Sequence, residues 1–391
     1  MSDFLRRLAI ITTHPIQYNA PLFELLTTRK EIEIKVFYTW GQSVLDKKYD
    51  PGFGKVIEWD IPLLKGYIYE FVENLAKEKG SHHFKGIDNP QLISRIKAYC
   101  PNAILVYGWS FKSHLKAMRY FKNKIPVLFR GDSTLLNENG FISIFLRRIF
   151  LRWVYSHIDF ALVVGKNNYQ YFRKAGLKNK QLIAAPHVVD NKRFMCESAD
   201  CKAAAGQFRE RLNILPDNLI VLYAGKFEEV KNPEILPEAF SLAKFNEQVH
   251  LVMVGNGNLE TGLKQKYRNH SHIHFMDFQN QLMMPAIYEE ADVYVLPSKS
   301  ETWGLAINEA MANGKAIIVS DNCGCAVDLV ENGKNGYIFE SGNCKDLGEK
   351  LELIFEDPEI LEQMKKNSKE KIKKFSLEHL SGTIEKVVQG L

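Results

Sequence analysis

Short, unbroken apolar runs alternate along this chain with longer segments in which apolar and polar residues recur at helical spacing. Two of the runs cover residues 293–296 and 316–319 and are rich in β-branched side chains. Runs of this length and composition are typical of strands that are buried on both faces of a parallel sheet. We expect further strands at residues 8–13, 33–40, 103–107 and 218–225. The alternation predicts an α/β fold with doubly wound parallel sheets.

Between residues 296 and 316 the pattern predicts one helix that begins near Gly304 and ends at Gly314. Glycine suits the position after a helix because it adopts the left-handed conformation without a steric cost. Leu305 and Glu309 share one face, which we expect to look outward. The face that we expect to pack carries Ile307, Ala310 and Met311. A loop that leaves the carboxyl end of a parallel strand and enters a helix is a common binding place for phosphate.

At 391 residues the chain is too long for one compact core and suits two domains of ordinary size. Its 46% hydrophobic and 25% charged residues are typical of a soluble globular protein. The net charge of +5 suits an anionic nucleotide or a lipid surface, and is too small to indicate a nucleic-acid-binding protein. The apolar run after Arg6 and Arg7 is too short for an export signal, and no window reaches the roughly 18 apolar residues of a membrane span.

The six cysteines show no C-x-x-C spacing of the kind that zinc sites use. A reducing cytosol is the simplest setting for such a chain. Cys196 and Cys201 are near enough in sequence to form a disulfide, but we expect them to be buried or idle thiols.

The stretch PSKSETWGLAINEAMANGKAIIVSD, which begins at Pro297, places two carboxylates across the predicted strand-to-helix turn, with seven residues between them. It resembles the signature of retaining glycosyltransferase family 4, whose members have the GT-B fold. The resemblance implies that Glu301 binds hydroxyls of the donor sugar and Glu309 binds the ribose hydroxyls. A carboxylate suits this task because its hydrogen bonds are charge-assisted. The donor-binding turn would consist of Thr302, Trp303, Gly304 and Leu305, with backbone N–H groups that hold the diphosphate.

The sequence GKFEEVKNP, which begins at Gly225, resembles the family's phosphate-binding segment. By that resemblance Lys226 and Lys231 hold the donor diphosphate. Negative charge builds on the diphosphate as the glycosidic bond breaks, so a fixed cation stabilises that transition state most. Without the flanking glycine, two solvated lysines would be the simpler interpretation.

Two further turns are candidates for nucleotide contacts. Gly255 and Asn256 open a G-x-G turn after a buried run, and this turn lacks the rest of an NAD-binding motif. In the family the corresponding turn approaches the nucleotide. Phe278 ends the next predicted strand, where the family's base-recognition loop lies, although an aromatic residue at a strand end is more often part of the core.

The loop after the first strand carries His14, Gln17 and Tyr18, and its sequence HPIQY resembles that of a subset of the family. The resemblance places these residues on the acceptor side of the site. A histidine that only satisfies loop hydrogen bonds is the alternative interpretation of His14.

The main departure from the family lies at the sequence FRGDS. Most members have a His-Asp pair there, and here Asp132 is present without the histidine. Either Arg130 or a histidine from elsewhere, such as His14 or His114, supplies the lost contact, or the site is built differently.

The resemblance implies three parts of the chain. We expect an acceptor-side Rossmann-like domain over residues 1–190, a nucleotide-sugar-binding Rossmann-like domain over residues 191–374, and a final helix over residues 375–391 that returns to the first domain. The two domains of GT-B enzymes face a cleft. Residues 41–90 are irregular and suit either a variable acceptor-binding region or a surface excursion.

The predicted function is transfer of a sugar from a UDP- or GDP-sugar to a glycan or lipid-linked acceptor, with retention of the anomeric configuration, in cell-surface polysaccharide or lipopolysaccharide synthesis. The sequence contains no D-x-D motif, and we expect no metal and no cofactor, because cations and a helix dipole take the metal's place. A nucleotide-sugar epimerase of the same fold and a non-catalytic glycan-binding relative are the alternatives. The sequence does not identify the donor sugar, the acceptor or the oligomeric state.

Residues 142–155 predict a helix that combines basic and large apolar side chains. These are Arg147, Arg148 and Arg152 with Phe145, Ile149, Phe150 and Trp153. Such a helix can lie in a lipid headgroup layer. The alternative is that its apolar face packs on the sheet of the first domain. We expect a cytoplasmic protein with peripheral contact at the inner membrane face.

Overall fold

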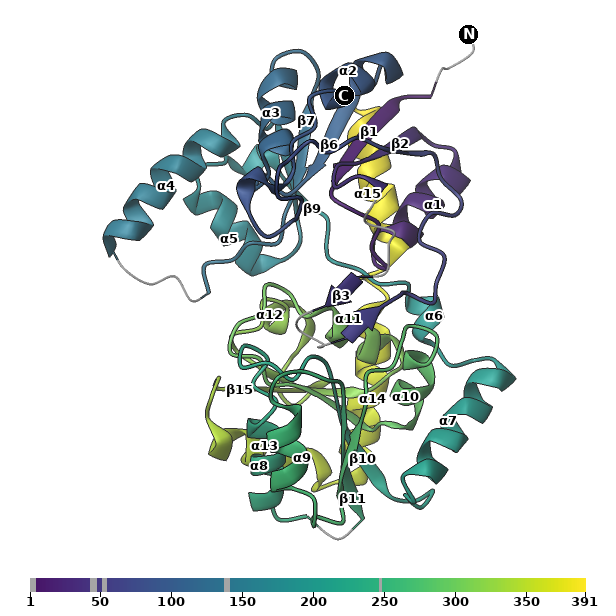
Figure 1. Cartoon of the computed structure of the whole chain (residues 1–391). Helices are drawn as coiled ribbons and strands as arrows, with labels where there is room; N and C mark the ends of the chain where they lie inside the picture. Colours follow the sequence, from purple (N-terminus) through teal and green to yellow (C-terminus); the bar gives the residue numbers. More distant parts are fainter. Residues whose placement is uncertain (1–4, 43–47, 51–54, 137–140, 246–247) are drawn as a thin grey trace. The chain divides into compact units, whose positions relative to one another are not determined.

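The structure is a computed structural model that describes residues 5–42, 48–50, 55–136, 141–245 and 248–391. The chain divides into two units (Figure 1). Unit 1 comprises Met1–Lys47, Pro62–His187 and Leu377–Leu391, and unit 2 comprises Lys48–Ile61 and Val188–Ser376. Within the irregular stretch predicted at residues 41–90, residues 43–47 and 51–54 lie outside the described residues.

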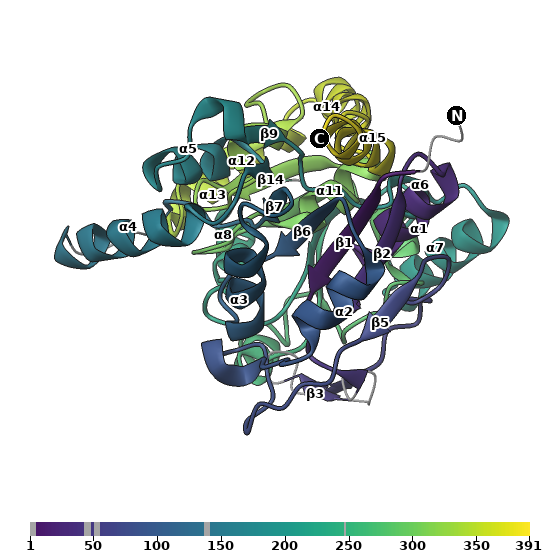
Figure 2. The same cartoon turned by 90° about the horizontal axis from the view of Figure 1, so that it is seen from above.

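Parallel strands form the sheet of unit 1. They are β1 (Arg7–Thr12), β2 (Glu33–Tyr38), β5 (Tyr69–Phe71), β6 (Ala103–Tyr107), β7 (Val127–Arg130), β8 (Phe160–Val163) and β9 (Leu182–Ala184). Among the described residues the order is β5-β2-β1-β6-β7-β8-β9, and Figure 2 shows β6, β1 and β2 side by side. The order reverses between β1 and β6, so the loops after these two strands are neighbours at the carboxyl edge.

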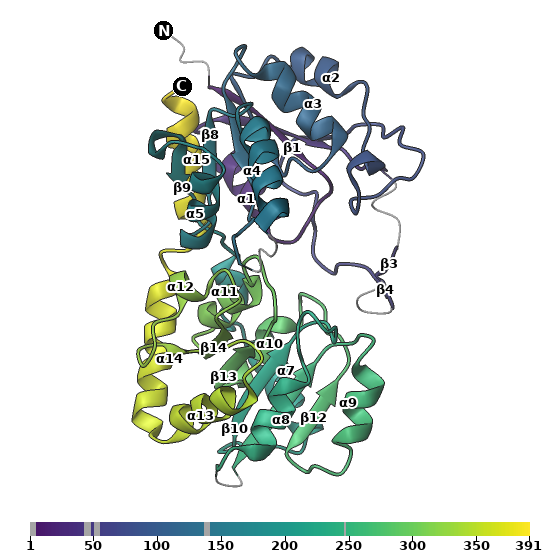
Figure 3. The same ribbon diagram turned by 90° about the vertical axis from the view of Figure 1, so that its left-hand side faces the viewer.

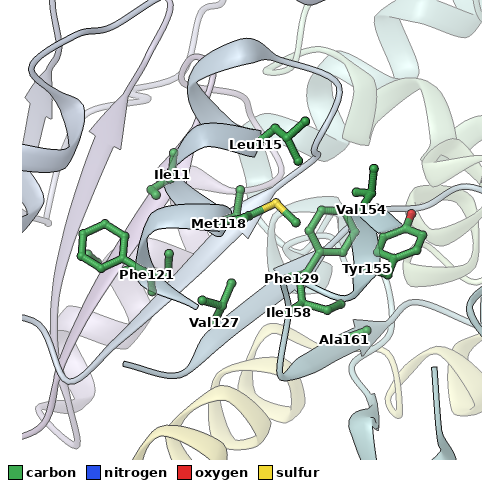
Figure 4. Packing of buried hydrophobic residues seen from close by; sticks show 14 of the residues in the cluster. Ile11, Leu115, Met118, Phe121, Val127, Phe129, Val154, Tyr155, Ile158 and Ala161 are labelled. Carbon is green, nitrogen blue, oxygen red and sulfur yellow. The ribbon is translucent and has the colours of Figure 1, made fainter. Parts of the chain in front are cut away.

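Helices cover both faces of this sheet. They are α1 (Ala20–Arg29), α2 (Leu92–Tyr99), α3 (Lys112–Phe121), α4 (Phe141–Tyr155), α5 (Lys166–Lys174) and α15 (Leu377–Gln389), with the 3₁₀ turns η2 (Phe84–Gly86) and η3 (Asn179–Gln181). Figure 3 shows α1 and α15 on one side of β1, and α2 and α3 on the other. Figure 4 shows Met118 of α3 near Phe129 of β7 and Tyr155 of α4, and all three belong to one buried cluster. Coverage on both faces explains why the strands read as unbroken apolar runs.

Unit 2 contains a second sheet of parallel strands. They are β10 (Leu219–Ala224), β11 (Val249–Val254), β12 (Ile273–Met276), β13 (Val293–Leu296), β14 (Ala316–Ser320) and β15 (Gly336–Phe339). In the described part of the unit their order is β12-β11-β10-β13-β14-β15, with a reversal between β10 and β13. A separate antiparallel pair joins β3 (Lys48–Asp50) to β4 (Lys55–Ile57). The predicted α/β class with two doubly wound parallel sheets is confirmed.

The helices of unit 2 are α6 (Asn191–Phe194), α7 (Ala199–Arg211), α8 (Ile235–Leu242), α9 (Glu260–Lys266), α10 (Met284–Glu290), α11 (Leu305–Ala312), α12 (Ala326–Leu329), α13 (Cys344–Phe355) and α14 (Pro358–Ile372). The predicted helix near Gly304 is α11, and Gly314 follows it with a φ of 73°. The prediction that Glu309 looks outward is wrong, because its side chain is only 4% exposed. The reason is that α6 and α14 pack against α11 in addition to β13 and β14.

Cys196 and Cys201 form a disulfide, so the expectation of two idle thiols is wrong. Between them Ser198 caps α7 by accepting a hydrogen bond from the backbone N–H of Cys201. This turn brings the two Cα atoms to 5.5 Å, which is within the usual range for a disulfide.

Gly255 links the loops that follow β10 and β11. Its φ is 151°, and a Cβ atom at this position would lie 1.9 Å from the carbonyl oxygen of Gly225. Only glycine fits this close approach of two backbones. The turn therefore sets the distance between the carboxyl ends of the two strands.

We expect Gly255→Ala to lower the free energy of unfolding by about 3 kcal/mol, because it adds both backbone strain and a steric overlap. The matched control is Gly262→Ala in α9, where a Cβ atom meets open space and the helix gains propensity. Urea unfolding followed by circular dichroism measures both changes. Equal stability of the two variants would show that this backbone contact is not a constraint.

Candidate active site

The loops after β10 and β13 meet where the strand order of unit 2 reverses. The backbone N–H of Lys299 donates to the carbonyl of Val230 at 2.9 Å, which joins the two loops directly. Below them, the Tyr294 hydroxyl of β13 donates to the carbonyl of Ala224 at 3.0 Å. Ligands of doubly wound sheets bind at such a reversal.

Lys231 and Glu301 form an ion pair across these two loops, with Nζ donating to Oε2. Their side chains are 26% and 18% exposed. The Glu301 backbone is tied to the loop after β14, because its N–H donates to Asn322 and its carbonyl accepts from Gly324. Two residues that the sequence predicts separately are therefore brought together, on a support made of three loops.

Lys226 lies half-buried at the start of the loop after β10. The Tyr223 hydroxyl donates to its carbonyl at 2.7 Å, which fixes the backbone. Burial, together with the nearby Glu301 and Glu228 carboxylates, raises the pKa of Tyr223. The hydroxyl therefore stays protonated and keeps this hydrogen bond over the physiological pH range.

The turn into α11 is built by a glycine and a buried tryptophan. Gly304 has a φ of 101°, and a Cβ atom there would lie 2.8 Å from Leu296 Cδ2. The Trp303 indole N–H donates to Asn308 Oδ1 at 2.8 Å, and the ring is only 3% exposed. Thr302 is exposed and Leu305 is half-buried. The first turn of a helix presents N–H groups without intrahelical partners, which suits an anion.

Glu309 is the fifth residue of α11, and its side chain is buried inside the unit. Its Oε2 accepts a hydrogen bond from the Tyr288 hydroxyl of α10 at 2.8 Å. The carboxylate is thus held by the Tyr288 hydroxyl and is not a solvated surface group.

Asn256 connects the loops after β11 and β12. Its Oδ1 accepts from the Phe278 backbone N–H at 2.7 Å, and its Nδ2 donates to the carboxylates of Glu260 and Asp277. The side chain is 7% exposed, whereas Phe278 is half-buried. Asn256 therefore acts on the position of Phe278.

In unit 1 the predicted candidate Arg130 is buried, and its guanidinium donates to the carbonyls of Ala185 and Pro186 at 2.7 and 3.0 Å. These contacts hold the chain that leaves β9. They place His187 beside Asp132, with Nε2 and Oδ2 4.0 Å apart. Burial, with a further contribution from Arg130, lowers the pKa of His187 well below its ordinary value. The imidazole is therefore neutral at pH 7.

Sequence reasoning missed His187. Its position in the sequence, directly after Pro186, indicated only a connection between domains. The available signal was that β7 and β9 are both parallel strands of one sheet, so residues beyond their carboxyl ends share one edge.

The other unit 1 candidates lie in the loop after β1. His14 Nδ1 is 2.8 Å from the Thr13 hydroxyl, and its ring meets Trp40 edge-on. Gln17 and Tyr18 are half-buried. His114 is fully buried in α3 and hydrogen-bonds the carbonyls of Tyr107 and Gly108, and burial lowers its pKa to about 4. These contacts give His114 a role inside the core.

Comparison with known proteins found a family model that matches part of unit 2. Residues 205–371 match the family model for glycosyl transferases group 1. The matched span contains the ion pair of Lys231 and Glu301 and the whole of α11.

Two curated relatives illustrate the similarity. The N,N'-diacetylbacillosaminyl-diphospho-undecaprenol alpha-1,3-N-acetylgalactosaminyltransferase of Campylobacter jejuni is 25% identical over 63% of this chain and 65% of its own. The D-inositol 3-phosphate glycosyltransferase of Streptomyces bingchenggensis is 31% identical over 47% of this chain and 42% of its own. The chain thus spans less than two thirds of the length of these relatives.

Solved structures share the fold over nearly the full chain. The Anabaena protein HepE in complex with UDP has a TM-score of 0.74 at 15% identity, with 99% of this chain and 100% of that chain covered. WaaG, a glycosyltransferase involved in lipopolysaccharide biosynthesis, has a TM-score of 0.68 at 13% identity, with 98% and 100% covered.

Replacing Arg130 should raise the pKa of His187. We expect Arg130→Met to move this pKa upward, toward but not beyond 6.5, because the nearby cation is lost while the imidazole stays buried. Arg130→Lys keeps the charge without the two-pronged hydrogen bonding, so its His187 pKa should stay close to that of the wild type. Histidine NMR titration, assigned with His187→Gln, measures the shift. An identical His187 pKa in wild type and Arg130→Met would contradict this electrostatic coupling.

Proposed function

We propose that this chain transfers a sugar from a nucleotide diphosphate donor to a glycan or lipid-linked acceptor, because residues 205–371 match the family model for glycosyl transferases group 1. The observation that carries the proposal is the ion pair of Lys231 and Glu301 where the strand order of unit 2 reverses. It sets a cation for a diphosphate beside a carboxylate for sugar hydroxyls, next to the N-terminus of α11.

A nucleotide diphosphate is the proposed ligand of unit 2. The HepE structures of Anabaena, which share the fold, are complexes with UDP and with UDP-glucose. In the present chain, the turn of Gly255 and Asn256 and the neighbouring loop of Phe278 would approach the nucleotide, and Glu309 would bind the ribose. Either UDP or GDP is compatible with this arrangement.

The proposed reaction retains the anomeric configuration. The bond between the anomeric carbon and the diphosphate oxygen breaks, and the acceptor oxygen bonds to the same face of that carbon. The acceptor proton passes to the leaving diphosphate. Glu301 orients the sugar, and Lys226 and Lys231 stabilise the charge that develops on the diphosphate. These cations supply the stabilisation that a metal ion would give, so we propose a metal-independent reaction.

Unit 1 supplies the acceptor side in this proposal. Asp132 and the neutral His187 offer one carboxylate and one imidazole to a sugar hydroxyl, and His14, Gln17 and Tyr18 are further contact candidates. Arg130 positions His187 and does not itself reach the substrate, because its guanidinium is occupied by two carbonyls.

Surface-glycan synthesis is the proposed setting. A Staphylococcus aureus capsular polysaccharide biosynthesis glycosyltransferase is 25% identical over 42% of this chain, and WaaG shares its fold. Among the described residues, no helix is long and apolar enough to cross a membrane. The proposed contact with a lipid-linked acceptor is peripheral, at the inner membrane face.

A screen of nucleotide sugars for thermal stabilisation tests the proposal, because a ligand at about 100 times its dissociation constant adds about 2.7 kcal/mol. The stabilising donor is then incubated with and without glycan acceptors. Free nucleotide diphosphate should appear together with a glycosylated acceptor. Isomerised donor without acceptor would favour an epimerase, and binding without either product would favour a non-catalytic relative.

We expect Glu309→Gln to weaken nucleotide binding by about 1 to 1.5 kcal/mol, because a charged hydrogen bond to ribose becomes a neutral one. Tyr288→Phe is the matched control, since it removes the hydroxyl that Glu309 accepts from and leaves the carboxylate in place. Calorimetry with UDP and GDP measures both. Unchanged affinity in Glu309→Gln, or equal losses in both variants, would remove the ribose assignment.

Lys226→Met and Lys231→Met should each lower kcat by about a hundredfold or more, because a fixed group that stabilises developing charge is worth about 2.7 to 4 kcal/mol. Binding of the nucleoside monophosphate should change less than kcat. EDTA should leave the wild-type rate unchanged. Turnover that EDTA abolishes and that Mg²⁺ or Mn²⁺ restores would show that the reaction needs a metal.

A further inference from the structure

Helix α4 of unit 1 exposes a run of large apolar side chains. Figure 1 shows this helix extending outward from the sheet of its unit. We call its exposed apolar residues the α4 face, and they are Phe145 (59% exposed), Leu146 (61%), Ile149 (56%), Phe150 (45%) and Trp153 (42%). Exposed apolar residues are usually scattered singly, so five on one helix need an explanation.

The α4 face points away from the core. At about 100° per residue, Phe145, Ile149 and Trp153 lie within about 80° of one another around the helix. Leu151 and Val154 lie roughly opposite them, and both are buried in the unit 1 cluster. The alternative that the apolar residues pack on the sheet is therefore wrong for the α4 face.

Aromatic contacts hold the α4 face in a fixed arrangement. Phe150 packs edge-on against Trp109 at a centroid distance of 5.5 Å, and it lies 5.7 Å from Trp153. The guanidinium of Arg119, from α3, lies over the Trp153 ring at 5.6 Å. The face thus combines a tryptophan with a cation beside it, a pairing that suits the boundary between headgroups and acyl chains.

The charge around the α4 face is positive. Helix α4 carries Arg147, Arg148 and Arg152 and contains no acidic residue. All three arginines are exposed. Arg148 and Arg152 lie along the border between the buried and the apolar sides, whereas Arg147 lies on the same side of the helix as the buried Leu151 and Val154. On α3, Lys116 is exposed as well. An occupant of the face must tolerate or neutralise this charge.

We propose that the α4 face inserts into the headgroup layer of an anionic lipid leaflet, with Arg148 and Arg152 bound to lipid phosphates. The 15 residues of α4 span about 22 Å, which is less than the ~30 Å hydrocarbon core, so the helix lies along the surface. A second copy of the chain fits less well, because it would bring two sets of arginines together. This inference does not depend on glycosyl transfer.

Flotation of the full chain with vesicles tests the proposal, with phosphatidylcholine alone and with about 30% phosphatidylglycerol, at low and high salt. We expect binding to the anionic vesicles only, and weaker binding at high salt. Arg148→Gln and Arg152→Gln together should lower the partition coefficient roughly 25-fold, because each basic residue near an anionic leaflet contributes about fivefold. The charge-matched control changes the exposed Lys366 and Lys374 of unit 2 to Gln and should float like the wild type.

Two further measurements separate insertion from simple charge attraction. Phe145→Ser, Leu146→Ser and Ile149→Ser together keep the arginines, and this variant should lose at least tenfold in partition. Brominated lipids should quench Trp153, and the quenching should be absent in Trp153→Phe. Circular dichroism checks that each variant is folded. Equal flotation of the arginine variant and its control, unquenched Trp153, or lipid-free dimerisation through the face would overturn the proposal. No nucleotide is present, so a failed transfer assay leaves the result unaffected.

Discussion

The reversal of strand order between β10 and β13 is the constraint on which unit 2 depends. It makes neighbours of two loops that are about 70 residues apart in the chain, and Lys231 and Glu301 occupy those loops. The hydroxyls of Tyr223 and Tyr294 donate to backbone carbonyls at the start of the Lys231 loop. The loop after β14 forms hydrogen bonds with the backbone of Glu301. A ligand that meets the pair therefore meets groups whose positions are already fixed, which lowers the ordering cost of binding.

In unit 1 the candidate residues are held in position by different contacts. The guanidinium of its buried Arg130 donates hydrogen bonds to the carbonyls of Ala185 and Pro186. These bonds fix the position of His187 relative to Asp132. A buried cation is costly unless it is hydrogen-bonded, and here two carbonyls accept hydrogen bonds from the guanidinium. The imidazole is kept neutral by burial, so it can both donate and accept a hydrogen bond.

Local pattern was sufficient for the fold and insufficient for several side chains. The apolar run at Val293–Leu296 predicted β13 without error, because a strand buried on both faces has no polar position. The burial of Glu309 was not predictable, since it depends on α6 and α14, which lie far from α11 in sequence. His187 was missed for the same reason, because its neighbour Asp132 is reached only through the order of β7, β8 and β9. For α4, the sequence predicted a helix with basic and apolar residues, but it did not show which apolar residues the core buries.

Helix α15 has a consequence for how the molecule is made. Unit 1 is assembled from three separate stretches, and the last of them, Leu377–Leu391, brings Glu385 to within 2.8 Å of Arg29 on α1. Glu385 is almost wholly buried, and α15 packs against α1. Helix α1 therefore lacks this packing partner until Leu377–Leu391 is present. On a ribosome, which releases residues in order, Val188–Ser376 emerges before unit 1 can close. A chimera that exchanges unit 1 between related chains must therefore exchange both ends of the polypeptide together.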